Sequence, residues 1–211
     1  TVTIGTRPGA DYARFGAAVK DLACGVAGPI VYNVQGGTYT ENLLIEELLG
    51  ATATNTVTFR SPSRDSVILR STGGNVITLN GADHVAFENM SIRMDGSSGF
   101  TVNITNQGDY NRFENCHIYN NTSVTSTASN PVCISGSTTS YSTSGKNGHY
   151  NEFLDNDIEG GYMVATVWGN GTANPSVGNK FINNNFKRGY YYGAYMYYTD
   201  SLVFQDNNID D

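Results

Sequence analysis

Apolar positions recur along the chain in a short motif that occurs five times. Each copy has a phenylalanine, an Asn or Asp two residues later, and an Ile or Phe five residues after the phenylalanine. The repeated residues are Phe87, Phe113, Phe153, Phe181 and Phe204, which gives spacings of 26, 40, 28 and 23 residues. A repeat of about two dozen residues that varies by insertion is typical of a solenoid, in which each unit buries its apolar face against its neighbours.

Within each copy the apolar residues alternate with polar ones, which predicts β-strands. The Asn or Asp after the phenylalanine predicts a turn, because these residues tolerate left-handed backbone. No helical pattern separates the strands. The sequence therefore predicts an all-β fold, a right-handed single-stranded parallel β-helix with one coil per repeat. Equivalent residues should then stack in rows about 4.8 Å apart. One row reads Arg112, Glu152, Lys180, an order of charges that suits neighbouring strands.

The first residues follow a different pattern. Residues 1–5 predict a strand, and Tyr12, Phe15, Val19 and Leu22 follow at helical spacing, with Asp11 as the expected N-cap. A helix before a solenoid predicts a cap over the exposed end of the core. We therefore expect residues 1–29 to form an N-terminal strand and capping helix, and residues 30–211 to form the coils. The last residues fall inside a repeat, so further coils or a partner are expected to cover that end.

Composition narrows the possible partners. The chain has 211 residues and a net charge of −7, which argues against nucleic acid and anionic membranes. No apolar run reaches about 18 residues, so no membrane insertion is expected. The chain begins at Thr1 without Met, which suggests a processed product. Abundant Gly, Asn, Ser, Thr and Tyr are typical of an extracellular β-rich protein.

Several segments of the first 70 residues match a known pattern. The chain resembles the right-handed β-helix modules of large secreted or cell-surface proteins of Bacteroidetes, and its later coils resemble the generic parallel β-helix repeat. The resemblance implies an extracellular or cell-surface location and little about activity. The matching segments are Ile4–Gly5, Asp11–Phe15, Ala17–Val19, Cys24–Val31, Gly37–Glu41 and Gly50–Phe59.

The Gly37–Glu41 turn is also similar to the start of pectin methylesterases and related polysaccharide-active β-helices. Two of their catalytic signatures, the Asp-Phe-x-x-Gly and Arg-Pro-Trp segments, are absent from this sequence, and the single Gln-Asp pair, Gln205–Asp206, belongs to the last copy of the repeated motif. The Arg-x-Pro-x-x-Arg motif of pectate lyases is absent too, and Arg60–Arg64 is only a superficial echo of it. The single Asp-His pair, Asp83–His84, stands without that second motif. These absences argue against both activities.

One face of the predicted coils gathers groups that are able to do chemistry. The positions flanking the last apolar residue of each motif point outward, which brings His117, Asp157, Glu159 and Lys187 onto one face. Carboxylates beside a cation on a β-helix face are how acidic-sugar lyases bind Ca²⁺ and place a base. The simpler interpretation is a solvated polar row, so Ca²⁺ is only a possible cofactor and none is required.

A second face is rich in tyrosine. If Ala194 and Met196 point inward, Tyr195 and Tyr197 point outward, and Trp168 in the preceding coil extends the row together with Tyr191. Exposed aromatic rings with hydroxyls suit stacking on sugar rings or a protein interface. The alternative is that these rings pack beneath insertions such as the Ser/Thr-rich segments 122–130 and 135–148, or against the next coil.

The remaining chemistry-bearing residues give no strong signal. Cys24, Cys116 and Cys133 are an odd set, so they cannot all pair internally, and free buried thiols are the simplest expectation. No Cys/His spacing fits zinc. The sequence therefore favours a non-enzymatic surface module, an adhesin or stalk that binds polysaccharide or a surface protein through its tyrosines. The alternative is a polysaccharide lyase or hydrolase acting on an acidic polysaccharide through the His117 cluster.

Overall fold

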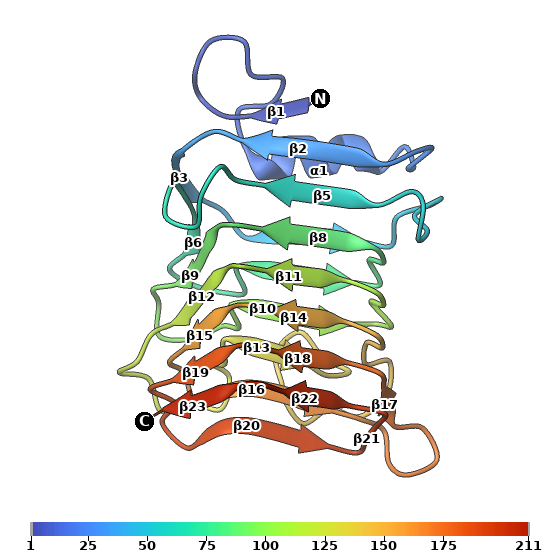
Figure 1. Cartoon of the computed structure of the whole chain (residues 1–211), viewed down its shortest axis with the longest axis vertical. Coiled ribbons are helices and arrows are strands. Elements are labelled where there is room, and N and C mark those ends of the chain that lie inside the picture. The colour runs from blue at the N-terminus through green and yellow to red at the C-terminus, as the bar shows by residue number, and fades with distance from the viewer. Residues whose placement is uncertain (1, 211) are drawn as a thin grey trace.

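The fold is a single coil of strands that winds into a stack, as Figure 1 shows. A computed structural model describes residues 2–210. Nearly every coil contributes one strand to each of three sheets, and every named strand pairing is parallel. This arrangement confirms the parallel β-helix that the repeated motif predicts. No helix among the described residues is long and apolar enough to cross a membrane.

Three long sheets, here called A, B and C, form the walls of the coil. Sheet A contains β1 (Val2–Ile4), β2 (Ile30–Val34), β5 (Val57–Arg60), β8 (Val85–Glu88), β11 (Arg112–Glu114), β14 (Glu152–Leu154), β18 (Lys180–Ile182) and β22 (Val203–Gln205). Sheet B contains β3 (Gly37–Thr40), β6 (Val67–Ser71), β9 (Ser91–Met94), β12 (His117–Asn120), β15 (Asp157–Glu159), β19 (Asn185–Lys187) and β23 (Asn208–Asp210). Sheet C contains β4 (Leu43–Glu46), β7 (Ile77–Asn80), β10 (Val102–Thr105), β13 (Val132–Ile134), β16 (Met163–Trp168) and β20 (Tyr192–Tyr197). A short pair, β17 (Ser176–Val177) and β21 (Thr199–Asp200), stands beside them.

The predicted aromatic row runs through the core on the inner side of sheet A. Phe87, Phe113, Phe153 and Phe181 are fully buried, and their rings stack on one another with centroids 4.9–5.3 Å apart. Phe204 ends the row as a tilted, 38% exposed ring. The row also extends upstream through Phe59 to Tyr32, which the motif did not include. Stacked rings in one angular position fix the register of all the coils.

The turn between sheets A and B depends on asparagine in two ways. The residues two positions after the core phenylalanines have left-handed backbone, with φ between 50° and 58°, as the motif predicts: Asn89, Asn115, Asp155, Asn183 and Asp206. In the next position, Asn156 accepts a bond from the Cys116 N–H at 2.8 Å, and Asn184 accepts one from the Asn156 N–H at 3.0 Å. Buried backbone N–H groups need hydrogen-bond partners, and here the asparagine of the following coil accepts the bond from the N–H group of each turn.

A matching row lies at the corner that leads into sheet A. Asn151 accepts a bond from the Asn111 N–H at 3.0 Å, and Asn179 accepts one from the Asn151 N–H at 2.9 Å. All three side chains are buried. The two asparagine rows together hold the corners at a fixed angle around the aromatic core.

The N-terminal helix covers the first coil, but it begins later than predicted. Helix α1 spans Phe15–Leu22, and its N-cap residue is Arg14 without a side-chain cap. The expected cap, Asp11, instead accepts bonds from the backbone and hydroxyl of Thr3 at 2.8 and 2.9 Å. The first helical N–H groups, of Phe15 and Gly16, donate to the carboxylate of Glu41 at 3.0 and 2.8 Å. A carboxylate from the next coil therefore replaces the local cap, which also suits the helix dipole.

The charged row on sheet A has the predicted order, and its ion pairs form both between strands and within one strand. Glu152 lies between Arg112 and Lys180 in neighbouring strands. Lys180 binds Glu152 at 2.8 Å, whereas Arg112 binds Glu114 on its own strand at 2.6 Å. The predicted order of charges is confirmed, and Arg112 forms its ion pair within its own strand because Glu114 offers it a near carboxylate.

Candidate functional site

Sheet B presents the predicted polar cluster on its outer face. His117 lies beside Asp157 in the neighbouring strand, and Glu159 lies beside Lys187. The contacts run diagonally: His117 Nε2 is 3.7 Å from Glu159 Oε2, and Lys187 Nζ is 3.2 Å from Asp157 Oδ1. The four residues therefore converge as the repeat register requires.

An arginine from a distant loop completes this cluster. Arg64, in the loop after β5, places Nη1 2.6 Å from Asp157 Oδ2 and also donates to the carbonyl of Asp155 at 2.9 Å. Arg188 binds the other carboxylate, that of Glu159. Sequence reasoning missed Arg64, because 93 residues separate it from Asp157 and no repeat position marks it.

The protonation states follow from these neighbours. Burial alone raises the pKa of Asp157, but hydrogen bonds from Asn185 and Lys187 and the charges of Lys187 and Arg64 lower it overall. Burial lowers the pKa of His117, although Glu159 opposes this effect. At neutral pH the cluster therefore combines a charged Asp157 with a neutral imidazole.

This arrangement limits the chemistry of the cluster. A general acid needs a carboxyl group that stays protonated near neutral pH, usually because burial raises its pKa. Asp157 is the opposite case, and its oxygens already accept bonds from Arg64, Lys187 and Asn185. Across residues 2–210 no three His, Cys, Asp or Glu side chains are grouped closely enough to hold a metal. Binding of Ca²⁺ therefore stays a prediction.

Sheet C carries the predicted aromatic residues on its outer face. Ala194 pairs with Ala165 and Met196 with Val167, on the side of the strand that packs against the core. Tyr195 and Tyr197 consequently point outward, as predicted, next to Trp168 in the preceding strand. We refer to the connected rings at this end of sheet C as the aromatic band: Tyr162, Trp168, Tyr191, Tyr192, Tyr195 and Tyr197.

The aromatic band is continuous but unevenly exposed. The ring of Trp168 lies 4.3 Å from that of Tyr197 and 5.9 Å from that of Tyr195. Tyr191 and Tyr192 are 58% and 43% exposed, whereas Tyr195 and Tyr197 are half-buried. A hydrogen bond with Tyr191 raises the pKa of the Tyr192 hydroxyl.

The insertion at residues 135–148 covers one side of the band. The ring of Tyr141 meets Trp168 edge-on at 5.8 Å, and Trp168 Nε1 donates to Ser144 Oγ at 3.2 Å. Thr166, on the same outer face, is fully buried. Packing beneath the insertion, the alternative drawn from the sequence, therefore describes the Trp168 end, while the Tyr191 end is open to solvent.

A second outer row of rings lies at the corner before sheet A. His84, Tyr110 and Tyr150 stack with centroids 5.0 and 4.9 Å apart, and all three have left-handed backbone. Tyr150 in turn lies against Gly178, where an added Cβ would come within 2.4 Å of the ring. Because the rings stack face to face, mainly their edges contact solvent. This row therefore suits structural support better than stacking on a ligand.

The three cysteines are unpaired. Cys116 and Cys133 are buried thiols, as expected, and burial raises the pKa of each to about 12. Cys24 differs from the expectation because it lies exposed just after the end of α1.

No protein-family model matches this chain, and a search of curated proteins found no match.

Comparison of folds gives a consistent answer. The structure is similar to pectin methylesterase PemA from Erwinia chrysanthemi, with a TM-score of 0.60 and 16% identity over 88% of this chain. It is also similar to a pectin methylesterase variant in complex with a hexasaccharide, with a TM-score of 0.57 and 16% identity, again over 88% of this chain. This chain covers 54% of the length of each of these two proteins.

A third similar structure is the pectin methylesterase of Aspergillus niger, with a TM-score of 0.56 and 13% identity over 98% of this chain and 75% of that protein. At these identities the likeness establishes the parallel β-helix fold alone. An activity does not follow from a shared fold.

Proposed function

We propose that this chain is a polysaccharide-binding β-helix module of a secreted or surface protein, with the aromatic band as its binding surface. The observation that carries the proposal is the continuity of the band: six aromatic side chains from two successive coils form a connected row on the outer face of sheet C. Tyr191 and Tyr192 leave much of their surface in contact with solvent.

The chemistry of the band suits sugar rings. Aromatic faces attract the C–H face of a pyranose, and tyrosine hydroxyls bond to sugar hydroxyls at the ring edge. A row of rings along one strand suits an extended chain, because Tyr192, Tyr195 and Tyr197 follow one another along β20. The band itself contains no charged side chain, so it favours the apolar face of a sugar over its charge. A protein partner is the other occupant that an exposed aromatic surface accepts.

Affinity electrophoresis tests this proposal directly. The native protein is run through gels that contain one polysaccharide each, with pectin and polygalacturonate as acidic examples and a β-glucan and a mannan as neutral ones. We expect retardation in at least one gel, and we expect the Trp168→Ala and Tyr191→Ala variants to lose it. The Tyr110→Ala variant, which removes an exposed ring on another face, serves as the matched control. Equal mobility of all variants in every gel would refute the proposal.

A second candidate function is supported by the cluster on sheet B. His117, Asp157, Glu159 and Lys187 converge there, and Arg64 and Arg188 add further positive charge. Cations on a β-helix face suit an acidic polysaccharide, and the similar folds are pectin methylesterases. On this view the chain is a lyase or hydrolase acting on such a polymer.

The two functions separate in a simple assay. A lyase produces unsaturated uronates that absorb in the ultraviolet, and a hydrolase releases new reducing ends. Both products are measured on a panel of acidic polysaccharides with and without Ca²⁺. Product formed by the native protein and lost in the Asp157→Asn variant would support the enzyme, while binding without product would support the module. The bacterial lineage suggested by the first 70 residues stays a prediction.

A further inference from the structure

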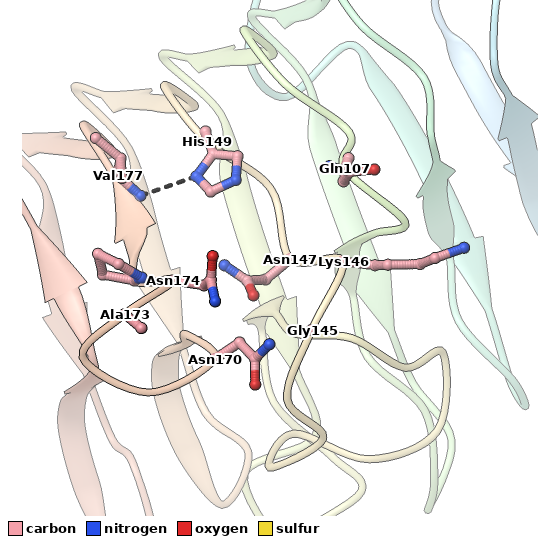
Figure 2. A pocket seen from close by; sticks show the side chains of 10 residues that line it. Gln107, Gly145, Lys146, Asn147, His149, Asn170, Ala173, Asn174 and Val177 are labelled. Atoms are coloured by element: carbon pink, nitrogen blue, oxygen red, sulfur yellow. Dashed lines mark hydrogen bonds between the residues drawn. The ribbon is translucent and has the colours of Figure 1, made fainter.

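A polar groove lies around the corner from the aromatic band, between two loops. Its volume is about 510 Å³, within the roughly 300–1,000 Å³ range of small-molecule sites. One wall is the end of the 135–148 insertion and the residues that follow it, and the other is the loop between β16 and β17. Its polar lining consists mainly of the side chains of Gln107, Asn147, His149, Asn170 and Asn174 (Figure 2).

One side chain in this groove has an unusual environment. Asn147 is only 3% exposed, and its amide nitrogen Nδ2 is buried without a hydrogen-bond partner among the described residues. Figure 2 shows this amide directed into the space beside Asn174. A buried polar group without a partner is costly, and in native proteins such a group calls for a specific explanation. A ligand atom that accepts a bond from Nδ2 supplies one.

The neighbouring histidine is held in one tautomer. The backbone N–H of Val177 donates to His149 Nδ1 at 3.0 Å, so the proton of the neutral ring lies on Nε2. Figure 2 shows this second nitrogen on the side of the ring that faces away from Val177. The backbone N–H of His149 donates to Asp109 Oδ1 at 2.7 Å, which fixes the residue from behind. His149 thereby offers a positioned N–H donor.

The chemistry of the lining selects the ligand class. Four amide side chains and one imidazole supply neutral donors and acceptors, while Ala173, Pro175 and Val177 supply a small apolar wall. No lining residue is a carboxylate, so the groove does not suit a metal ion, and the single Lys146 is too little positive charge for a polyphosphate. Neutral groups that both donate and accept are what vicinal hydroxyls bind. We propose that this groove binds a single hexopyranose unit, with Asn147 Nδ2 donating to one of its hydroxyls.

The groove goes beyond the proposed function, because it lies outside the aromatic band. The two are nevertheless adjacent: Ser144, next to Gly145 of the groove, accepts the bond from Trp168 Nε1, and Trp168 is two residues from Asn170. A sugar chain lying on the band therefore has a polar pocket at its side in which one unit is recognised by its hydroxyls. The band would supply affinity, and the groove would supply selectivity.

The test uses single sugars, which are too small to depend on the band. Free galactose, glucose, mannose and galacturonate are titrated into the isotope-labelled protein, and backbone and side-chain amide shifts are followed by NMR. We expect at least one sugar to shift the Asn147 side-chain signals and the backbone amides of His149 and Val177. The Asn147→Leu variant keeps the size of the side chain and removes both polar atoms, so it should weaken binding at least tenfold.

Stability measurements make the result unambiguous. Because Asn147 Nδ2 bonds to no described protein group, Asn147→Leu should leave the urea midpoint of unfolding unchanged or raise it. Asn174→Ala, on the exposed wall, should weaken binding without affecting folding, while Tyr110→Ala, outside both the groove and the band, should leave single-sugar binding unchanged. The proposal is overturned if none of the sugars shifts these signals even at the highest sugar concentration, or if Asn147→Leu binds the sugar as tightly as the native protein does.

Discussion

The ring of Phe153 lies 4.9 Å from the ring of Phe181 in the next coil, and the two planes are only 3° apart. This pair is one step of a stack that continues through Phe113 and Phe87 at similar distances. Each ring contacts the same residue type above and below, so a change at one step is felt by two coils. The outward rows on sheets B and C inherit their alignment from this stack.

Removing a ring from the middle of the stack should therefore lower the stability of the fold strongly. Phe153→Ala removes a fully buried ring with neighbours on both faces, and we expect a loss of about 3–5 kcal/mol in the free energy of unfolding. Urea denaturation followed by circular dichroism measures it. Tyr110→Ala, which removes a ring that is 50% exposed, should cost clearly less. A smaller loss for Phe153→Ala than for Tyr110→Ala would contradict the account of the core.

The buried asparagine rows should be as sensitive as the core. Asn156 accepts a bond from the Cys116 N–H and donates to the Phe113 carbonyl at 3.0 Å. Asn156→Ala leaves the Cys116 N–H and the Phe113 carbonyl buried without a hydrogen-bond partner. Each should lower the free energy of unfolding by about 1–3 kcal/mol. Exposed Asn174→Ala should change the unfolding free energy by no more than about 0.5 kcal/mol. If the two variants unfold at the same urea concentration, the turn rows do not hold the coils together.

The pH dependence of stability should reveal the ion pairs on sheet B. The folded-state pKa of Asp157 lies below its usual value of 3.8, so the folded protein binds this proton less readily than the unfolded chain. The stabilising contribution of Asp157 is therefore fully present above about pH 4 and is lost as the pH falls through the folded-state pKa. Thermal melts of native protein and Asp157→Asn should differ most at neutral pH and converge in acid. A difference in melting temperature that grows in acid would mean that folding raises the pKa of Asp157, which contradicts the ion pairs described here.

Thiol labelling should distinguish the cysteines by burial. Cys24 is exposed, whereas burial raises the pKa of Cys116 and of Cys133 to about 12. Since the thiolate is the reactive species, iodoacetamide at neutral pH should modify Cys24 alone in the folded protein and all three residues in denaturant. Peptide mass spectrometry reads this out. Modification of Cys116 in folded protein at the rate of Cys24 would show that the coil opens at that turn.

The fold was largely predictable because stacking repeats the same environment. Phe113 and Phe153 occupy equivalent places, so one motif specifies a whole row, and the outward direction of Tyr195 follows from the inward direction of Ala194. Phe59 escaped the motif because it lacks the Asn and the second apolar residue, although its strand alternates in the same way. The helix start was misplaced because Glu41, from another coil, caps α1 where a local residue was expected.

The sites were less predictable, because loops without any repeat complete them. Arg64 reaches Asp157 from a segment that carries no periodic signal, and it turns a possible reactive cluster into a set of ion pairs. The groove around Asn147 lies between the end of the 135–148 insertion, whose composition predicts only a loop, and the loop between β16 and β17. Only the three-dimensional arrangement shows that one of their amides is buried without a partner.

Calorimetric titration of a polysaccharide fragment into native protein and single-ring variants tests the central claim most directly. The fragment is taken from a polysaccharide that retards the native protein in the gel. Tyr195→Ala and Trp168→Ala should each raise the dissociation constant Kd by up to about tenfold, since stacking of one aromatic ring contributes about 0.5–1.5 kcal/mol. Tyr110→Ala should bind as the native protein does. Unchanged affinity in both band variants, with their folding intact, would contradict polysaccharide binding by the aromatic band.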